Sequence, residues 1–276
     1  MTTDRQGKLI NRRDASNQFL RIRETLEQTP VGIITDIDGT IAEITKTPYE
    51  TQISPLCRNV LSKLASNTGL LAILTGRDSL KARDMLGIDE AIYVGNHGLE
   101  MWRDGKLEVR EDAQEYKTTV RDLVYKLRCR LNLSGLIVED KGVSASVHYR
   151  LSKEIDQTRS TIIGVLKQIP EAKNMMITEG KLVVEIRPPL AVNKGTSLRQ
   201  LVAEYGLNGV ICLGDDTADV DTFKALHNLT SSGTCVGLSI GVLGKDTPPN
   251  IETHADILID GVHEAVELLQ RITELY

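Results

Sequence analysis

Short apolar runs alternate with amphipathic segments over the first third of the chain. The runs contain almost no polar residues, which predicts strands that are buried on both faces of a parallel sheet. The amphipathic segments place apolar residues at helical spacing, and one of them opens with Ser54 as a candidate N-cap before Pro55. The pattern predicts strands at 31–35, 70–76 and 91–95 and helices at 16–28, 54–69 and 79–86.

The pattern changes from residue 105 onward. Residues 143–150 alternate between apolar and polar side chains, which predicts a strand with one wet face. Amphipathic helices are predicted at 115–131 and 152–169, and residues 174–188 predict a hairpin that turns near Glu179. This middle part therefore reads as an α+β module with an antiparallel sheet.

The α/β pattern resumes after Pro188 and Pro189, so the chain reads as one α/β domain into which a second module is inserted. The later segments are helices at 193–206, 217–226 and 263–275 and strands at 209–216, 234–241 and 255–260. The predicted domains are an N-terminal helical extension at 1–29, an α/β core at 30–104 and 189–276, and the inserted module at 105–188.

Composition and charge narrow the classes of function. The 276 residues carry a net charge of −5 and include only two Phe and one Trp, so neither a basic surface nor base-stacking platforms for nucleic acid are expected. No apolar run approaches a membrane span, and the N-terminus lacks the apolar stretch of a signal peptide. None of the four cysteines lies in a CxxC pair. We expect a cytoplasmic protein that binds neither nucleic acid nor membrane.

Polar residues follow the predicted strands or begin the predicted helices at four places in the α/β core. Because the carboxyl ends of parallel strands form the ligand crevice of such a sheet, these residues are expected to converge there. Each place alone is more often a turn or a helix cap, but four of them in one order favour a functional site. They are Asp36-x-Asp38-Gly39, Thr75-Gly76-Arg77, Lys194-Gly195 and Gly214-Asp215-Asp216.

These residue types are those of a phosphoryl-transfer site. Asp36 can attack phosphorus and form an aspartyl-phosphate, while Asp38 can protonate the leaving oxygen and later activate water. Thr75 can donate a hydrogen bond to a phosphoryl oxygen, and Lys194 can neutralise the charge of Asp36 and of the phosphate. Catalysis would then depend mostly on positioning and electrostatics.

The same site gathers carboxylates that would repel one another without a bound cation. Asp36, Asp38, Asp215 and Asp216 supply oxygen ligands only, with no His or Cys, and such a set suits Mg²⁺. We expect Asp215 to ligate the metal ion and Asp216 to orient a bound water. A magnesium site is therefore predicted at the carboxyl end of the sheet.

These ordered motifs resemble those of the haloacid dehalogenase-like phosphohydrolases, and the inserted module resembles that of the trehalose-phosphatases within this superfamily. The resemblance lies in VGNHGLE (94–100), VEDKGVSASVHYR (138–150), GKLVVEIRP (180–188), NKG (193–195) and GDDTADVDTF (214–223). It implies an α/β fold with a Rossmann-like parallel-sheet core and an inserted α+β cap of the C2 type. It also implies Mg²⁺ dependence, hydrolysis of trehalose 6-phosphate, and a functional link to a trehalose-6-phosphate synthase.

The resemblance also implies that Glu139, Lys141 and Glu185 of the cap hold the sugar hydroxyls. Physically this is sensible, because carboxylates accept hydrogen bonds from hydroxyls and a lysine donates them. Without the surrounding motifs, a solvated hairpin pair would be the simpler reading of Glu139 and Lys141. His97 contacts either the substrate or its own loop. The other predicted substrate-binding residues are Gly39, Gly76 and Arg77.

One motif departs from the family pattern. Trehalose-phosphatases often read GDDxTDE there, whereas this chain has Ala218 in place of the threonine and Val220 in place of the glutamate. Asp215 and Asp216 remain, so hydrolysis should survive. The two changes bear on substrate identity or on closure of the cap.

Two alternatives stay open from the sequence. A phosphatase of the same superfamily could act on sucrose phosphate or on a glucosyl- or mannosyl-3-phosphoglycerate, and the carboxylate of a glycerate would require added Arg or Lys in the pocket. A non-catalytic sugar-phosphate sensor need not keep the nucleophile, the acid and the metal ligands, all of which this chain retains. A panel of phosphate-release assays separates these functions.

Overall fold

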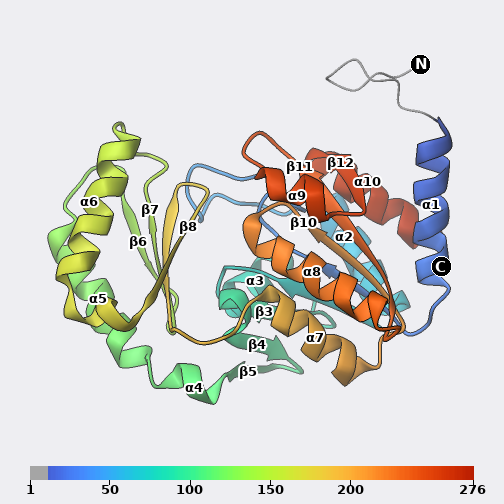
Figure 1. The fold of residues 1–276 in the computed structure, drawn as a ribbon, viewed down its shortest axis with the longest axis horizontal. Helices are drawn as coiled ribbons and strands as arrows, with labels where there is room; N and C mark the ends of the chain where they lie inside the picture. Colours follow the sequence, from blue (N-terminus) through green and yellow to red (C-terminus); the bar gives the residue numbers. More distant parts are fainter. Residues whose placement is uncertain (1–11) are drawn as a thin grey trace.

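The computed structural model describes residues 12–276, which form a large and a small β-sheet with helices around them (Figure 1). The predicted extension at 1–29 therefore lies partly outside the described residues. Its described part forms helix α1 (Arg12–Leu26), and Ile22 and Leu26 of this helix are buried in the hydrophobic core.

The large sheet has eight strands, and its six parallel strands are those that the apolar runs predict. The order across the sheet is β12 (Ile257–Asp260), β11 (Val236–Leu243), β10 (Gly209–Gly214), β1 (Val31–Thr35), β2 (Leu70–Leu74), β3 (Ile92–Gly95), β4 (Glu100–Arg103) and β5 (Lys106–Val109). Ile33 and Ile34 of β1 are both buried, one on each face of the sheet. Strand β1 lies between β10 and β2, so the residues that follow these three strands reach the same edge.

Helices cover both faces of the large sheet, which explains why its strands are apolar throughout. One face packs against α1, α2 (Pro55–Asn67), α3 (Ser79–Leu86) and α10 (Gly261–Thr273). The other packs against α7 (Lys194–Tyr205), α8 (Thr217–Ser231) and α9 (Pro249–His254). Ser54 caps α2 by accepting a hydrogen bond from the backbone N–H of Cys57, as the sequence predicts. None of the helices formed by residues 12–276 combines the length and hydrophobicity needed to span a bilayer.

The inserted module is built on a four-stranded antiparallel sheet with its own hydrophobic core. Its strands, in order, are β6 (Ile137–Asp140), β7 (Ala145–His148), β9 (Val183–Arg187) and β8 (Met176–Gly180). Helices α5 (Lys117–Arg130) and α6 (Ile155–Gln168) pack on one face of this sheet, and the chain also forms the short helices α4 (Glu111–Gln114), η1 (Asn96–Gly98) and η2 (Pro170–Asn174). The predicted fold class, a parallel α/β core with an inserted α+β cap, is confirmed.

The domain boundary predicted between residues 104 and 105 stays a prediction, and the pairing of one strand bears on it. Strand β5 pairs antiparallel with β4 in the large sheet, so the division between residues 104 and 105 cuts the turn of a hairpin. The apolar pattern does not indicate this strand, because β5 is largely exposed and lacks the apolar run by which the other core strands are predicted. The chain leaves the large sheet only after Val109.

Candidate active site

The first motif and the fourth lie next to each other because β1 and β10 are neighbouring parallel strands. Asp36 follows β1 directly, and Asp215 follows β10. Thr75 follows β2 on the other side of β1, and its side chain is buried. Gly39 has a φ of +88°, and a Cβ atom there would collide with the carboxylate of Asp215. Glycine at this position therefore leaves room for an acid to face Asp36.

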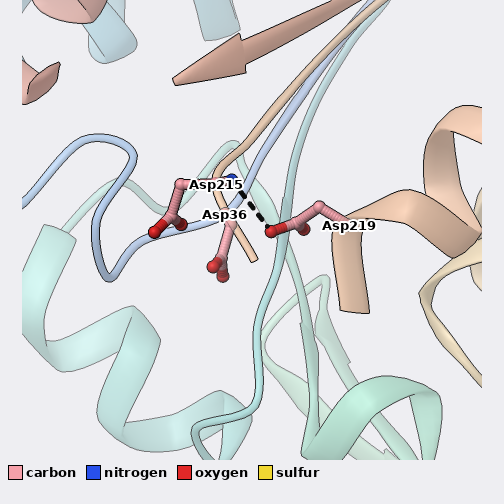
Figure 2. Close-up of side chains that lie close together, drawn as sticks. All are labelled: Asp36, Asp215 and Asp219. Atoms are coloured by element: carbon pink, nitrogen blue, oxygen red, sulfur yellow. Dashed lines mark hydrogen bonds between the residues drawn. The ribbon is translucent and has the colours of Figure 1, made fainter. Parts of the chain in front are cut away.

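Three buried carboxylates meet at this edge of the sheet. Oxygen atoms of Asp36, Asp215 and Asp219 all lie within 4.8 Å of one another (Figure 2). Burial strongly raises the pKa of Asp36, and the neighbouring acids Asp219 and Asp215 raise it further, while Lys194 opposes the rise. Oδ1 of Asp36 is buried and accepts no well-aligned hydrogen bond, although the ammonium of Lys194 lies 3.0 Å away. A buried set of carboxylate oxygens fits a hard divalent cation such as Mg²⁺.

Lys194 supplies the cation that the structure places beside these acids. Its ammonium lies 3.0 Å from Oδ1 of Asp36 and 2.8 Å from Oδ1 of Asp219. The residue stands at the first position of α7, and Asn193 caps this helix, so the side chain starts from a fixed backbone. Burial works against the charged amine, but Asp219 and Asp36 together raise the pKa of Lys194. The predicted neighbourhood of Lys194 and Asp36 is therefore observed.

Asp219 is a residue to which sequence reasoning assigned no role. Its carboxylate accepts hydrogen bonds from the backbone N–H groups of Asp215 and Asp216, as well as from Lys194. The side chain of Asp216, by contrast, caps α8 by accepting from the backbone N–H of Thr217. The available signal was spacing, because an acid three residues after an N-cap acid can bond back to the start of its helix.

The carboxylate of Asp38 is held by an arginine. Nε and Nη2 of Arg77 lie 2.6 and 2.7 Å from its two oxygens. The fork is largely buried, since the Arg77 side chain is 12% exposed. Asp38 follows Asp36 by two residues in the chain but does not belong to the cluster of Asp36, Asp215 and Asp219, and its shortest contacts are to Arg77.

The predicted sugar-binding residues of the cap face the core across a pocket. Glu185 Oε2 lies 2.5 Å from Nε2 of His97, and its other oxygen lies 3.5 Å from the ammonium of Lys141. Lys141 also donates to the backbone oxygen of Gly76 at 2.9 Å. Burial lowers the pKa of His97, while the basic groups around Glu185 hold the pKa of that carboxyl well below its usual range. A Cβ at Gly76 would press on the His97 ring.

Glu139 of the cap also contacts the core. Its carboxylate lies 3.0 Å from Nζ of Lys81, on core helix α3, and 3.0 Å from Nε2 of His148, on cap strand β7. Burial would raise the pKa of Glu139, but the hydrogen bond with His148 and the charges of Lys141 and Lys81 outweigh it and lower the pKa to about 2. Glu139 is therefore ionised and already paired.

A second residue that sequence reasoning missed is Lys181. It lies in the β8–β9 turn of the cap, and its ammonium contacts Oδ2 of Asp215 in the core. Burial raises the pKa of Asp215 to about 6, although Lys181 opposes this rise. The contact could not be read from the sequence, because it depends on how the cap sheet is placed over the core.

A pocket between core and cap is lined by many of these groups, including Asp36 and Lys194, but not by Asp215 or Asp219. Its core-side wall includes the loop from Ile44 to Thr51, and its cap-side wall includes His148 and Arg150. These two residues lie on the strand face predicted to be wet, which faces the pocket. Ala218 also lines the pocket. Val220 of α8, in contrast, is buried in the hydrophobic core, so the family's glutamate position contributes no group to the pocket here.

Comparisons with known proteins agree with this arrangement. The family model described as trehalose-phosphatase matches residues 34–246. Trehalose-phosphate phosphatase B of Arabidopsis thaliana is 26% identical over 98% of this chain and 74% of its own length. The trehalose-phosphate phosphatase of Mycobacterium leprae is 28% identical over 78% of this chain and 52% of its own length.

Solved structures support the fold. The C-terminal domain of the trehalose-6-phosphate phosphatase of C. albicans matches with a TM-score of 0.74 and 22% identity, over 94% of this chain and 97% of that domain. A trehalose-6-phosphate phosphatase related protein matches with a TM-score of 0.73 and 23% identity, over 88% and 97% of the two chains. A haloacid dehalogenase-like hydrolase from Bacteroides thetaiotaomicron matches with a TM-score of 0.60. With the family model covering most of its length, this chain belongs to the trehalose-phosphatase family.

Proposed function

We propose that this protein is a Mg²⁺-dependent phosphatase that hydrolyses trehalose 6-phosphate to trehalose and phosphate. One observation carries the proposal. Asp36 and Lys194 of the core form an ion pair that lines the same pocket as Glu139, Lys141 and Glu185 of the cap. The core residues suit a phosphoryl group, and the cap residues suit sugar hydroxyls.

Asp36 is the proposed nucleophile. One of its carboxylate oxygens forms a bond to phosphorus while the bond between phosphorus and the sugar oxygen breaks, and Asp38 gives its proton to that oxygen. A water then attacks the aspartyl-phosphate, Asp38 takes the proton of this water, and the bond from phosphorus to Asp36 breaks to release phosphate. Lys194 balances negative charge at Asp36 in both steps, and Thr75 donates a hydrogen bond to a phosphoryl oxygen.

A divalent cation would be held by Asp36 and Asp215, with Asp219 beside them. When bound, Mg²⁺ supplies positive charge that neutralises the phosphoryl oxygens. The predicted participation of Asp38 and Asp216 in this site remains a proposal, and it now includes Asp219 as a further carboxylate.

Glu139, Lys141 and Glu185 are the proposed sugar-binding residues of the cap. In the structure each of them is paired with a residue of the core or of the cap, so the sugar hydroxyls would have to exchange with these partners. Gly39, Gly76, Arg77 and His97 remain proposed parts of the same pocket wall.

A related activity has a specific observation in its favour. Lys46 and Arg150 also line the pocket, and two such cations would suit the additional carboxylate of a glucosyl- or mannosyl-3-phosphoglycerate. A sensor without catalysis is disfavoured, because the nucleophile, its lysine and the carboxylate cluster are all assembled.

The deciding experiment is a phosphate-release panel with Mg²⁺ across trehalose 6-phosphate, sucrose phosphate and the two phosphoglycerates. We expect the highest kcat/KM with trehalose 6-phosphate, and indifference to it would reject this substrate. The Asp36→Asn variant should lose roughly 10⁴-fold or more in kcat while keeping its circular dichroism spectrum. Turnover like that of the wild type in this variant would reject the mechanism.

We also propose that the protein acts in the cytoplasm beside a trehalose-6-phosphate synthase that supplies its substrate. All four cysteines are free thiols, in keeping with a reducing compartment. Fractionation of the source cells and co-purification with synthase activity test these two points.

A further inference from the structure

The guanidinium of Arg77 donates four hydrogen bonds to other residues of the protein. Nε and Nη2 hold the two oxygens of Asp38 at 2.6 and 2.7 Å. Nη1 donates to the backbone oxygen of Pro48 at 2.7 Å, and Nη2 also donates to Oγ1 of Thr51 at 2.8 Å. A guanidinium has five N–H donors, and these contacts engage four of them. Little of Arg77 is left for a substrate.

The two hydrogen bonds from Arg77 fix the orientation of the Asp38 carboxylate, which is proposed to transfer a proton. A bidentate pair determines both the rotation and the tilt of the acid, unlike a single hydrogen bond. Thr51 adds a weaker contact to Oδ1 of Asp38 at 3.4 Å. Asp38 is therefore held by two residues, Arg77 and Thr51, which also bond to each other.

The other two contacts of Arg77 hold a wall of the pocket. Pro48 and Thr51 belong to the loop that lines the core side of the pocket, and Thr45 braces this loop by bonding to Thr51 at 3.0 Å and to the backbone oxygen of Thr47 at 2.7 Å. One buried guanidinium thus ties the loop to Asp38.

We propose that Arg77 is a positioning residue that acts through Asp38. It holds the carboxyl of Asp38 toward the leaving oxygen and fixes the loop from Ile44 to Thr51 against the same side of the pocket. This inference rests on the proposed function, since it takes Asp38 as the proton donor. It differs from the sequence-based prediction, in which Arg77 contacts the substrate.

The way in which the rate of hydrolysis depends on the leaving group distinguishes positioning of Asp38 from direct contact with the substrate. A sugar alkoxide is strongly basic and leaves only if it is protonated, whereas p-nitrophenolate is weakly basic and leaves without a proton. A defect in the placement of Asp38 should therefore slow the hydrolysis of a sugar phosphate and spare that of p-nitrophenyl phosphate. A defect in phosphate binding should slow both equally.

The test compares kcat/KM for these two substrates in the wild type, Arg77→Met, Arg77→Lys and Asp38→Asn. For Arg77→Met we expect a loss of roughly 10²–10⁴-fold on the sugar phosphate, the range for a lost acid or base, and less than about tenfold on the aryl phosphate. Asp38→Asn should show the same selectivity, and Arg77→Lys the same selectivity to a smaller degree.

Arg150→Met is the matched control. This arginine lines the same pocket but donates to the backbone oxygen of Lys181 at 2.6 Å and not to Asp38. Its removal should change kcat/KM for the two substrates to a similar extent. As a second readout, methylguanidinium in solution should restore sugar-phosphate hydrolysis to Arg77→Ala more than it does to Arg150→Ala.

Equal losses on both substrates in Arg77→Met and Arg77→Lys would overturn the proposal. If Arg77→Met does not fold, Arg77→Lys alone decides, because it retains the charge and the side-chain length. The comparison needs only one alkyl phosphate that the wild type hydrolyses. Failure of trehalose 6-phosphate as a substrate would therefore contradict the proposed function and leave this test intact.

Discussion

The ammonium of Lys194 lies 3.0 Å from Oδ1 of Asp36, in a site where the lysine side chain is only 3% exposed. Each charge would be costly to bury alone, and each is stabilised by the other. The pair couples the stability of this edge of the sheet to its chemistry, because the atom that Lys194 faces is the proposed attacking group.

Lys194→Met should cost both stability and activity. Loss of one partner of a buried ion pair typically costs about 3–5 kcal/mol in unfolding free energy. We expect urea denaturation to show a drop of this size in the free energy of unfolding, and the rate of phosphate release to fall by about 10³-fold or more. Mn²⁺ should partly restore the free energy of unfolding. Lys224→Met, on the exposed side of α8, is the control and should resemble the wild type. Similar behaviour of both variants would contradict the role of Lys194.

Asp219→Asn and Asp216→Asn separate the third carboxylate of the site from its neighbour. Asp219 belongs to the buried cluster, whereas the side chain of Asp216 caps a helix. We expect Asp219→Asn to weaken Mn²⁺ binding, measured by calorimetry, by about tenfold or more, and Asp216→Asn to cost at most about 1 kcal/mol in unfolding free energy. The reverse result would favour Asp216 as the metal-site residue predicted from the sequence.

Gly39→Ala should reduce cation affinity as well as stability. The added Cβ meets the carboxylate of Asp215, and the φ of +88° is strained for any residue with a side chain. Gly87→Ala is a matched control, because its φ is also positive, at +67°, but a Cβ there meets nothing within 4 Å. We expect both variants to lose about 1–2 kcal/mol in unfolding free energy and only Gly39→Ala to lose Mn²⁺ affinity. Equal Mn²⁺ affinities would show that Asp215 can move aside freely.

Lys181→Met should bind a divalent cation more tightly than the wild type does. The Lys181 ammonium contacts Asp215 and so competes with a cation for that carboxylate. Removal of this competitor should lower the Kd for Mn²⁺ by about tenfold, or about 1.4 kcal/mol. Lys46→Met removes a lysine that lines the same pocket and should leave the Kd unchanged. An unchanged Kd in Lys181→Met would mean that the contact does not compete.

Glu139 should contribute a pH-dependent part of the stability. Its folded-state pKa of about 2 lies below the ordinary value of 4.5, so the ionised group stabilises the fold. This contribution is fully present above about pH 5 and is lost as pH falls toward 2, with an upper size of about 3 kcal/mol. The free energy of unfolding, measured with urea from pH 7 to 2.5, should therefore fall more steeply for the wild type than for Glu139→Gln. Parallel curves would contradict the assignment.

The sequence was sufficient for the parts of the site that depend on strand ends. Asp36, Asp215 and Lys194 each follow an apolar strand or begin a helix, and a parallel sheet brings such positions to one edge. Asp219 and Lys181 could not be found in this way. The first depends on the geometry of one helical turn, and the second on the placement of the cap over the core, which no local pattern encodes.

Strand β5 illustrates a further limit. Its side chains are mostly exposed, and its membership of the large sheet comes from pairing with β4 rather than from burial of apolar residues. The pairing of Asp38 with Arg77 was hidden for a related reason, since the two residues lie 39 positions apart and only tertiary structure joins them.

The position of β1 in the sheet order sets a condition on synthesis. Asp36 follows a strand that is translated before the cap, whereas its partners Lys194, Asp215 and Asp219 come after the entire cap. One edge of β1 stays open until β10 has been translated and pairs with it. The growing chain therefore carries the proposed nucleophile before the groups proposed to act with it, and a message that stops before the Lys194 codon would encode a product that lacks Lys194, Asp215 and Asp219.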